Sequence, residues 1–267
     1  MKKATWMKIM SLALTLTVAL GLAACSKGGA KDDKKGTDEQ GPTKYLVGTE
    51  PTFAPFDTTD ENGNIIGFDM DLMKAIGKDQ GFEVEFKSFG FDALIPALKT
   101  KNCDIVAAGM NAEDEDRRKQ VDFSDTYYDS GLMVVVNKDN TTVKSLDDLT
   151  PDMKVAAQIG TTGADTAQKC KDEGKIKEAV INDGVDVCLL QVQNGDVDAL
   201  ILDKPVAENA AKTNDKIKIV GDVLNAESYG FAVAKGNADL LAKINTGLAN
   251  IKKDGTFEKI YKQWFPE

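Results

Sequence analysis

One carboxylate stands directly after an apolar segment of the sequence. Residues 199–202 (ALIL) form an uninterrupted apolar run that continues into Asp203, as a strand buried on both faces would if it ended in a charge. An aspartate at such a point most often caps a helix or forms a turn. The functional alternative is that its carboxylate receives a positively charged group of a ligand.

Further polar groups and glycines follow other predicted strands. In open α/β sheets, ligands bind beyond the carboxyl ends of the parallel strands. We therefore expect several strand ends to face one cleft together with Asp203. These strand ends carry Glu50, Gly109 with Met110, and Gln158 through a Gly/Thr turn to Thr161 and Thr162.

The elements that must position these residues alternate between strands and helices. Short apolar or alternating runs predict strands, and longer stretches with apolar residues at helical spacing predict helices. The predicted strands cover residues 45–49, 82–89, 104–109, 153–158 and 196–203. The predicted helices begin near residues 67, 92, 164 and 185. This alternation predicts an α/β protein in which mainly parallel sheets are flanked by helices.

The pattern restarts after residue 130, which predicts two lobes of similar construction. The chain would cross between the lobes near residues 135–138 and again near residues 228–231. Two such crossings allow the lobes to close over a ligand like a hinge. The predicted domains are lobe 1, residues 43–135 with 229–267, and lobe 2, residues 136–228.

The composition excludes several classes of protein. The 267 residues include no histidine, so a Ser-His-Asp triad and a histidine-bearing zinc site are excluded. The formal net charge of −10 argues against a nucleic-acid partner. We predict no metal site, no cofactor and no catalytic residue.

The first residues are typical of an export signal. Residues 1–8 carry three lysines, residues 9–22 are mostly apolar, and small residues precede Cys25. A membrane-spanning helix is the competing interpretation, but about 14 apolar positions fall short of the roughly 20 that a bilayer requires. The tetrapeptide LAAC resembles the lipobox of bacterial lipoproteins, which implies that residues 1–24 are removed and that Cys25 is lipidated. Residues 25–42 would then form a flexible tether, because they contain almost nothing apolar.

Three further cysteines follow Cys25 in the sequence. Cys103 precedes a buried strand and is most simply a small core residue. Cys170 and Cys188 could form a disulfide in an exported protein, or they could remain two thiols in a helical lobe. Spacing alone does not decide between these alternatives, because a disulfide requires a short distance between the Cα atoms.

Six segments along the chain resemble one family of proteins. Together, in order and at near-family spacing, they are similar to the polar amino-acid-binding proteins of ABC importers, which include glutamine-, histidine- and lysine/arginine/ornithine-binding proteins. The resemblance covers residues 44–265 and implies the two-lobed periplasmic-binding-protein fold of type II, with two hinge crossovers. The segments are VGTEPTFAPF, GFDMDLMKAI, FDALIPALKTKNCDIVAAGM, RRKQVDFSDTYY, ILDKP and GTFEKIYKQWF.

The resemblance implies roles for two charged residues and two backbone donors. Arg117 matches the arginine that holds the α-carboxylate of the ligand, although an arginine in a run such as EDEDRRKQ is usually solvated. Asp203 matches the carboxylate that receives the α-ammonium. Gly109 and Thr161 match backbone donors to the α-carboxylate, since a glycine allows close approach and Thr161 opens a helix whose N-terminus favours an anion.

The resemblance also implies contacts to the ligand side chain. Phe53 and Phe91 match an aromatic pair that sandwiches this side chain, although either residue alone would most often belong to the core. Glu50 matches a carboxylate near the tip of the side chain. The complete predicted ligand-binding set is Glu50, Phe53, Phe91, Gly109, Met110, Asn111, Arg117, Gln158, Thr161, Thr162 and Asp203.

The segment between Gly109 and Arg117 departs from the family pattern. The family usually has Thr-x-Thr after the glycine and seven steps to the arginine, whereas here there are eight steps and Asn111 and Glu113 stand near the hydroxyl positions. A glutamate beside a bound carboxylate would repel it, so we expect the insertion to turn Glu113 outward. Asn111 would replace the lost polar contact, and Arg118 is a weaker rival to Arg117.

The resemblance implies that the protein binds a free amino acid and is not an enzyme. It would capture a polar or basic L-amino acid, or cystine, and deliver it to the permease and ATPase of an ABC transporter. Cys25 would anchor it to the outer face of the bacterial cell membrane, or on its periplasmic side. Two alternatives remain: a sensory protein that presents the ligand to a receptor, and a dehydratase-like enzyme on the same fold.

Overall fold

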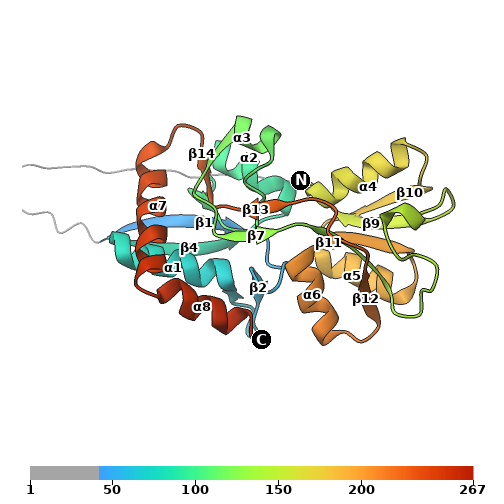
Figure 1. Cartoon of the computed structure of the whole chain (residues 1–267). Helices are drawn as coiled ribbons and strands as arrows, with labels where there is room; N and C mark the ends of the chain where they lie inside the picture. Colours follow the sequence, from blue (N-terminus) through green and yellow to red (C-terminus); the bar gives the residue numbers. More distant parts are fainter. Residues whose placement is uncertain (1–41, 267) are drawn as a thin grey trace, which may run out of the picture. The chain divides into compact units, whose positions relative to one another are not determined.

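A computed structural model describes residues 42–266, and most of the strands within this range belong to two five-stranded sheets. Each sheet carries helices on both faces and forms the centre of one lobe (Figure 1). We refer to the lobe built on the sheet that contains β1 as the first lobe and to the other as the second lobe. The predicted two-lobed α/β fold is therefore confirmed.

The sheet of the first lobe has the strand order β4-β1-β5-β14-β6. β1 pairs in parallel with β4 and β5, whereas β14 pairs antiparallel with β5 and β6. Because β14 comes from near the end of the chain, the chain returns to the first lobe after building the second. The strands are β1 (Thr43–Thr49), β4 (Phe82–Ser88), β5 (Ile105–Val106), β6 (Val121–Phe123) and β14 (Ala232–Ala234).

Helices cover both faces of this first sheet. α1 packs against α7 and α8 on one side, and α2 and α3 lie on the other side (Figure 1). Gly247 in α7 allows the close approach of α1, because a Cβ there would lie 2.8 Å from Cγ2 of Ile76. The helices are α1 (Phe68–Gln80), α2 (Leu94–Lys99) after the 3-10 turn η1 (Phe91–Ala93), α3 (Glu115–Gln120), α7 (Ala238–Lys253) and α8 (Thr256–Trp264).

The sheet of the second lobe has the strand order β10-β9-β11-β8-β12. β9, β10 and β11 are parallel, whereas β8 pairs antiparallel with both β11 and β12. The strands are β8 (Leu132–Asn137), β9 (Lys154–Gln158), β10 (Glu178–Asn182), β11 (Ala199–Asp203) and β12 (Ile217–Val220). The helices are η2 (Leu146–Asp148), α4 (Thr162–Asp172), α5 (Val185–Asn194) and α6 (Lys204–Thr213).

The apolar run before Asp203 is buried on both faces, as its sequence predicts. Ala199 and Ile201 pack in the cluster that contains α4, whereas Leu200 and Leu202 pack in the cluster that contains α5 and α6. Successive side chains of a strand point to opposite faces, so both layers of helices draw on this one run. The strand therefore holds Asp203 at a defined position at its carboxyl end.

Two short strands connect the lobes. β7 (Tyr128–Ser130) and β13 (Glu227–Tyr229) pair antiparallel and run between the two sheets (Figure 1). The first crossing therefore lies earlier than the predicted residues 135–138, because the apolar strand β8 already pairs with β11 in the second sheet. A small additional hairpin is formed by β2 (Thr58–Thr59) and β3 (Ile65–Ile66) in the first lobe.

The three cysteines of the described residues are free thiols. Cys170 in α4 and Cys188 in α5 belong to clusters on opposite faces of the second sheet, so the sheet separates them. The alternative of a disulfide between them is therefore excluded. Cys103 is buried beside Leu98 and Val106, as expected for a core residue.

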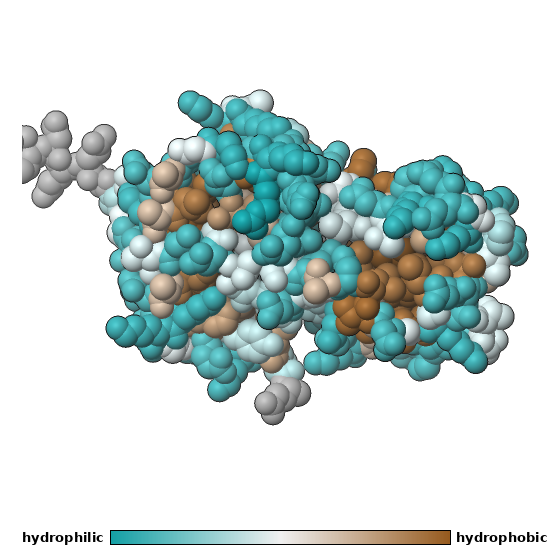
Figure 2. Space-filling view, turned by 45° about the horizontal axis from the view of Figure 1, so that its top comes forward, coloured by the Kyte–Doolittle hydropathy of each residue, from teal (hydrophilic) through white to brown (hydrophobic). Residues whose placement is uncertain are grey.

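The predicted signal peptide and lipidation site at Cys25, and all but the last residue of the predicted tether, lie outside the described residues. Within residues 42–266, no helix is long and apolar enough to span a bilayer. Most of the surface visible in Figure 2 is hydrophilic, and the largest hydrophobic area on this face belongs to the second lobe. Large apolar side chains with notable exposure include Ile181, Val187 and Leu190 on β10 and α5.

Candidate functional site

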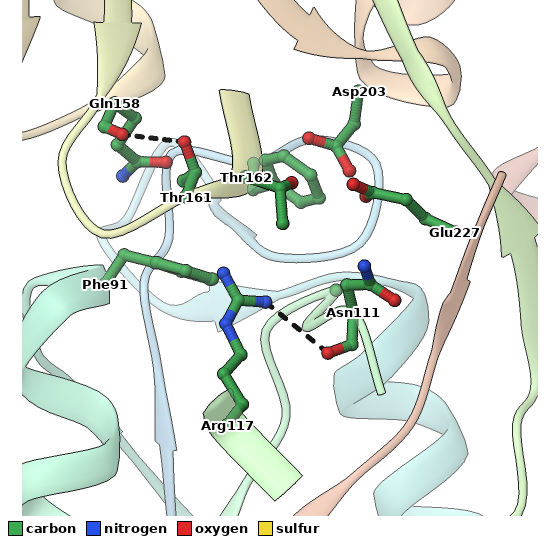
Figure 3. Close-up of a pocket in the computed structure, with 10 residues that line it drawn as sticks. Phe91, Asn111, Arg117, Gln158, Thr161, Thr162, Asp203 and Glu227 are labelled. Carbon is green, nitrogen blue, oxygen red and sulfur yellow. Dashed lines mark hydrogen bonds between the residues drawn. The ribbon is translucent and has the colours of Figure 1, made fainter. Parts of the chain in front are cut away.

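A pocket lies between the two lobes and receives residues from both. The empty space between its lining residues amounts to about 250 Å³, part of which is open to solvent. The first lobe contributes residues from loops and from the start of η1 and α3, the second lobe contributes residues from the ends of β9 and β11, and β13 contributes one more (Figure 3). The lining residues are Phe53, Phe91, Gly109, Asn111, Arg117, Gln158, Thr161, Thr162, Asp203 and Glu227.

Asp203 turns its carboxylate into this pocket and does not cap the following helix. Although Asp203 precedes α6, its side chain makes no capping hydrogen bond. Its Oδ2 atom instead accepts a hydrogen bond of 2.5 Å from the hydroxyl of Tyr229, which is itself 2.9 Å from the hydroxyl of Ser130. The interpretation of Asp203 as a helix cap is therefore excluded.

Glu227 brings a second carboxylate to the same corner of the pocket. Its side chain is buried and faces Asp203 across a short gap (Figure 3). Its Oε1 atom accepts a hydrogen bond of 3.0 Å from Asn225, whereas its Oε2 atom is buried without a partner among the described residues. Sequence reasoning missed Glu227, because a single glutamate in the segment NAESYGF shows no local sign of burial.

The environment raises the pKa of Asp203 to about 8. Burial is the main cause, because it removes water from the charged form, and the carboxylate of Glu227 is the second. The hydrogen bond from Tyr229 and the charge of Arg117 act in the opposite direction without cancelling these effects. The corner therefore favours either a proton or another positive group beside the two carboxylates.

Arg117 lies on the opposite side of the pocket and reaches across the cleft. The side chain of Asp114 caps α3 by accepting a hydrogen bond of 2.8 Å from the amide of Arg117. The guanidinium carbon lies 5.3 Å from the centre of the Phe91 ring, and Nη2 donates a hydrogen bond of 3.0 Å to the carbonyl of Gly160 in the second lobe. Nη1 also donates weakly to the carbonyl of Asn111 at 3.5 Å.

The insertion before Arg117 directs its neighbours away from the pocket. Arg118 donates to the carbonyl of Ala112 at 2.8 Å and lies 3.6 Å from the carboxylate of Glu113. The side chains of both Arg118 and Glu113 are more than half exposed. The structure thus places Glu113 outward as expected, and it favours Arg117 over Arg118 as the arginine of the site.

Gly109 lines the pocket, but its amide is already occupied. The amide donates a hydrogen bond of 2.9 Å to Oδ2 of the buried Asp69, so the predicted role of Gly109 as a donor to a ligand is wrong. The residue must nevertheless be glycine, because its φ is +51° and a Cβ would lie 2.5 Å from the ring of Phe53. Phe53 can therefore pack directly over the backbone of Gly109.

The N-terminus of α4 opens onto the pocket beside Arg117. Thr161 caps this helix, because its hydroxyl accepts a hydrogen bond of 3.1 Å from the amide of Ala164 and donates one of 2.7 Å to the carbonyl of Gln158. The amides of the first turn, at Thr162 and Gly163, have no acceptor within the helix. Together with the helix dipole they make this end of the pocket attractive to an anion.

Two predicted residues do not line the pocket. Met110 is buried in the cluster that contains Leu94 and Leu98 of α2, away from the pocket. Glu50 lies just behind the lining, where Oε2 accepts hydrogen bonds from Gln158 at 3.0 Å and from Thr52. Burial raises the pKa of Glu50, and these hydrogen bonds partly offset the increase.

Hydrogen bonds between the lobes show that the cleft is closed. Besides the bond from Arg117 to Gly160, Gln158 of the second lobe donates to Glu50 of the first. The amide of Val185 donates to the hydroxyl of Thr52 at 3.0 Å. The positive side of the pocket and its carboxylate corner are thus held at opposite ends of the same pocket.

Comparisons with known proteins identify a family of binding proteins to which this chain is similar. A sequence profile of the bacterial extracellular solute-binding proteins, family 3, matches residues 45–267. A probable histidine-binding protein of Neisseria gonorrhoeae is 34% identical over 250 residues, which cover 92% of this chain and 91% of that protein. The arginine-binding extracellular protein ArtP of Bacillus subtilis (strain 168) is 34% identical over 268 residues, covering 99% of this chain and 98% of that protein.

A solved structure extends the similarity to the fold. An ancestral arginine-binding protein bound to arginine superposes with a TM-score of 0.79 at 45% identity, covering 83% of this chain and 98% of that chain. The relatives named here are binding proteins rather than enzymes.

Proposed function

Because this chain belongs to the bacterial extracellular solute-binding proteins, family 3, we propose that it captures one polar or basic L-amino acid, or cystine, and delivers it to an ABC transporter permease. The coarser assignment, an amino-acid-binding protein of the kind that serves ABC transporters, follows from the family and its named relatives. The observation that carries the finer proposal is the placement of Arg117 and Asp203. They come from different lobes and stand at opposite ends of one closed pocket.

These two residues suit the two charges of an amino acid. Arg117, supported by the first turn of α4, would bind the α-carboxylate through charge-assisted hydrogen bonds. Asp203 would receive the α-ammonium. A ligand that carries both charges binds the closed arrangement better than an open one, so it would stabilise closure of the lobes. Phe53 and Phe91 would pack against the ligand side chain, with Thr161, Thr162 and Asn111 as polar neighbours.

The charge balance of the pocket favours basic ligands among the amino acids. Three carboxyl groups, those of Glu50, Asp203 and Glu227, lie in or next to the pocket, against the single guanidinium of Arg117. A ligand with a positive side chain can pair with these groups, whereas aspartate or glutamate would bring a further carboxylate to them. The named relatives include arginine- and histidine-binding proteins, and we therefore place arginine first among the candidates.

We further propose that the protein works at the outer face of the cell membrane. Family members are extracellular or periplasmic, and the segment LAAC supports lipidation of Cys25. The lipid would keep the protein close to the permease and its ATPase. Metabolic labelling with a radioactive fatty acid tests this proposal: label should enter the wild-type chain and should be absent from Cys25→Ser.

Thermal unfolding with a panel of ligands tests the binding function. The purified chain is unfolded and refolded to remove carried-over ligand, and its melting temperature is measured with each common L-amino acid and with cystine. A ligand that binds only the folded state raises the melting temperature, and the increase grows with the logarithm of the ligand concentration relative to the dissociation constant. One or a few basic or polar amino acids should produce a clear increase that Arg117→Gln and Asp203→Asn abolish. No increase with any of them contradicts the proposal.

A further inference from the structure

The unpartnered Oε2 atom of Glu227 is the starting observation. This oxygen is buried, the residue is only 2% exposed, and the side chain lines the pocket. A buried carboxylate oxygen without a donor is costly, because it has lost water and gained nothing in return. Two further carboxylate oxygens among the described residues, on Asp57 and Asp69, are also buried without a donor, but of the three residues Glu227 alone lines the pocket, where a ligand can supply one.

Two carboxylates at one corner add a second cost. Asp203 and Glu227 point toward each other, and the nearby charge of Glu227 disfavours ionisation of Asp203 (Figure 3). A proton held by Asp203 therefore lies between the two carboxyl groups when the pocket is empty. Burial and the charge of Glu227 raise the pKa of Asp203 to about 8, which keeps this proton in place at neutral pH.

We infer that Asp203 and Glu227 together form the seat for the positive group of the ligand, and that the arriving ligand displaces the proton shared by the two carboxylates. This inference rests on the proposed amino-acid-binding function. An α-ammonium carries three N–H donors, so it can donate hydrogen bonds to Oε2 of Glu227 and to the carboxylate of Asp203 at the same time. The proton leaves for the solvent, and the ammonium takes its place without any change in its own protonation.

Other charged groups that face the pair set the limits of this exchange. The hydroxyl of Tyr229, from β13, donates to Asp203 and therefore stabilises the charged form of that carboxylate. Arg117, from α3, acts in the same direction from across the pocket. Neither group contacts Oε2 of Glu227, so the ligand remains the source of its missing donor.

Isothermal titration calorimetry measures the displaced proton directly. The full exported chain is titrated with L-arginine and, separately, with L-glutamine at pH 7, in phosphate and in Tris. These buffers differ in ionisation heat, so the difference between the two binding heats counts the protons released. We expect close to one proton per bound ligand in the wild type. We also expect affinity to increase as the pH rises from 6 to 8, by up to about tenfold per pH unit.

Glu227→Gln tests whether the charge of Glu227 contributes to ligand binding independently of the stability of the fold. This variant keeps the shape of the side chain but removes the charge that is the second cause, after burial, of the raised pKa of Asp203, so Asp203 should ionise more readily at neutral pH. We expect proton release to decrease and affinity to fall by about tenfold or more, because a charge-assisted hydrogen bond is replaced by a weaker one. The ligand-free variant should unfold at the same temperature as the wild type or higher, since a neutral amide replaces a buried carboxylate whose Oε2 atom has no donor.

A matched control and the possible results make the test decisive. Glu208→Gln changes a glutamate on α6 whose side chain is 51% exposed, and it should leave affinity and proton release unchanged. Equal heats in both buffers, with unaltered affinity in Glu227→Gln, would overturn the inference while leaving the binding function intact. If neither arginine nor glutamine nor any other amino acid binds the wild type, the binding function itself fails and the inference fails with it.

Discussion

The hydroxyl of Tyr229 donates a 2.5 Å hydrogen bond to Oδ2 of Asp203, and Tyr229 lies on one of the two strands that connect the lobes. The carboxylate that faces the pocket is thereby tied to the hinge. Tyr229 is fully buried against Phe56 and is stacked on Tyr128, so its ring cannot move without disturbing the connection.

We predict that Tyr229→Phe weakens ligand binding while retaining the fold. The ring contacts remain, but the pKa of Asp203 rises further without its donor, so less of the carboxylate is charged at pH 7. The dissociation constant should increase about three- to tenfold, and stability should fall by ~1 kcal/mol. Calorimetric titration and urea unfolding of the ligand-free protein check both values. Unchanged affinity at pH 7 would show that the hydroxyl does not act on Asp203.

Arg117→Lys should reduce affinity for the ligand by about tenfold or more. A lysine cannot make two parallel hydrogen bonds to a carboxylate and cannot stack its charge on Phe91 as the guanidinium does. Arg118→Lys is the matched control, because Arg118 is largely exposed and contacts Ala112 and Glu113 instead. Fluorescence or calorimetric titration compares the two. Equal losses in both variants would show that the assignment of Arg117 is incorrect.

Gly109→Ala should damage both stability and binding. Its φ of +51° is unfavourable for alanine, and the added Cβ would lie 2.5 Å from the ring of Phe53. We expect a loss of roughly 2–4 kcal/mol in the free energy of unfolding, from backbone strain and overpacking together. Gly63→Ala is the control, because Gly63 has a φ of +81° but no atom within 4 Å of a Cβ, so only the strain remains. Urea unfolding should therefore show a clearly lower free energy of unfolding for Gly109→Ala than for Gly63→Ala.

The ligand-free protein should lose stability as the pH rises from about 5 to 8. Burial raises the pKa of Asp69 to about 7 and that of Asp203 to about 8, above their unfolded value of 3.8. Between the unfolded and the folded pKa of each group, the unfolded chain has lost a proton that the folded chain still holds. The free energy of unfolding therefore falls by about 1 kcal/mol per pH unit for each group. Urea unfolding at pH 5, 6.5 and 8 measures the slope.

Asp69→Asn provides the check on this pH dependence. The substitution removes one of the buried carboxyl groups with a raised pKa, so the decrease in stability between pH 5 and pH 7 should become shallower. An amide can still accept the hydrogen bonds that Asp69 receives from Gly109 and Tyr127. A slope identical to that of the wild type would mean that Asp69 ionises normally in the folded protein.

Much of the fold can be predicted from local pattern alone. The alternating strands and helices, the apolar strand before Asp203 and the helix cap at Thr161 depend on residues close together in the sequence, and the structure contains all of them. The position of the first crossing does not follow from local pattern, because the apolar run of β8 fits either lobe equally well until its partner β11 is known.

The pocket was only partly predictable. Nine of the eleven predicted ligand-binding residues line it, whereas Glu50 and Met110 do not. Glu227 was missed, and the amide of Gly109 proved to be occupied by Asp69, forty positions away in the sequence. Each difference arises from a contact between distant segments, to which periodicity and spacing are insensitive.

By itself, the sequence determined which segments become strands and helices, that two lobes form, and which side chains could carry the charges of a site. Those properties follow from hydrophobic periodicity and from the residues that start and end each element. Only the tertiary structure decided that Asp203 faces the pocket instead of capping α6, that Glu227 stands beside it, and that Arg117 crosses the cleft to Gly160. The physical reason is that the orientation and ionisation of a buried polar group depend on the partners and the water that folding brings to it or removes, and those partners come from distant parts of the chain.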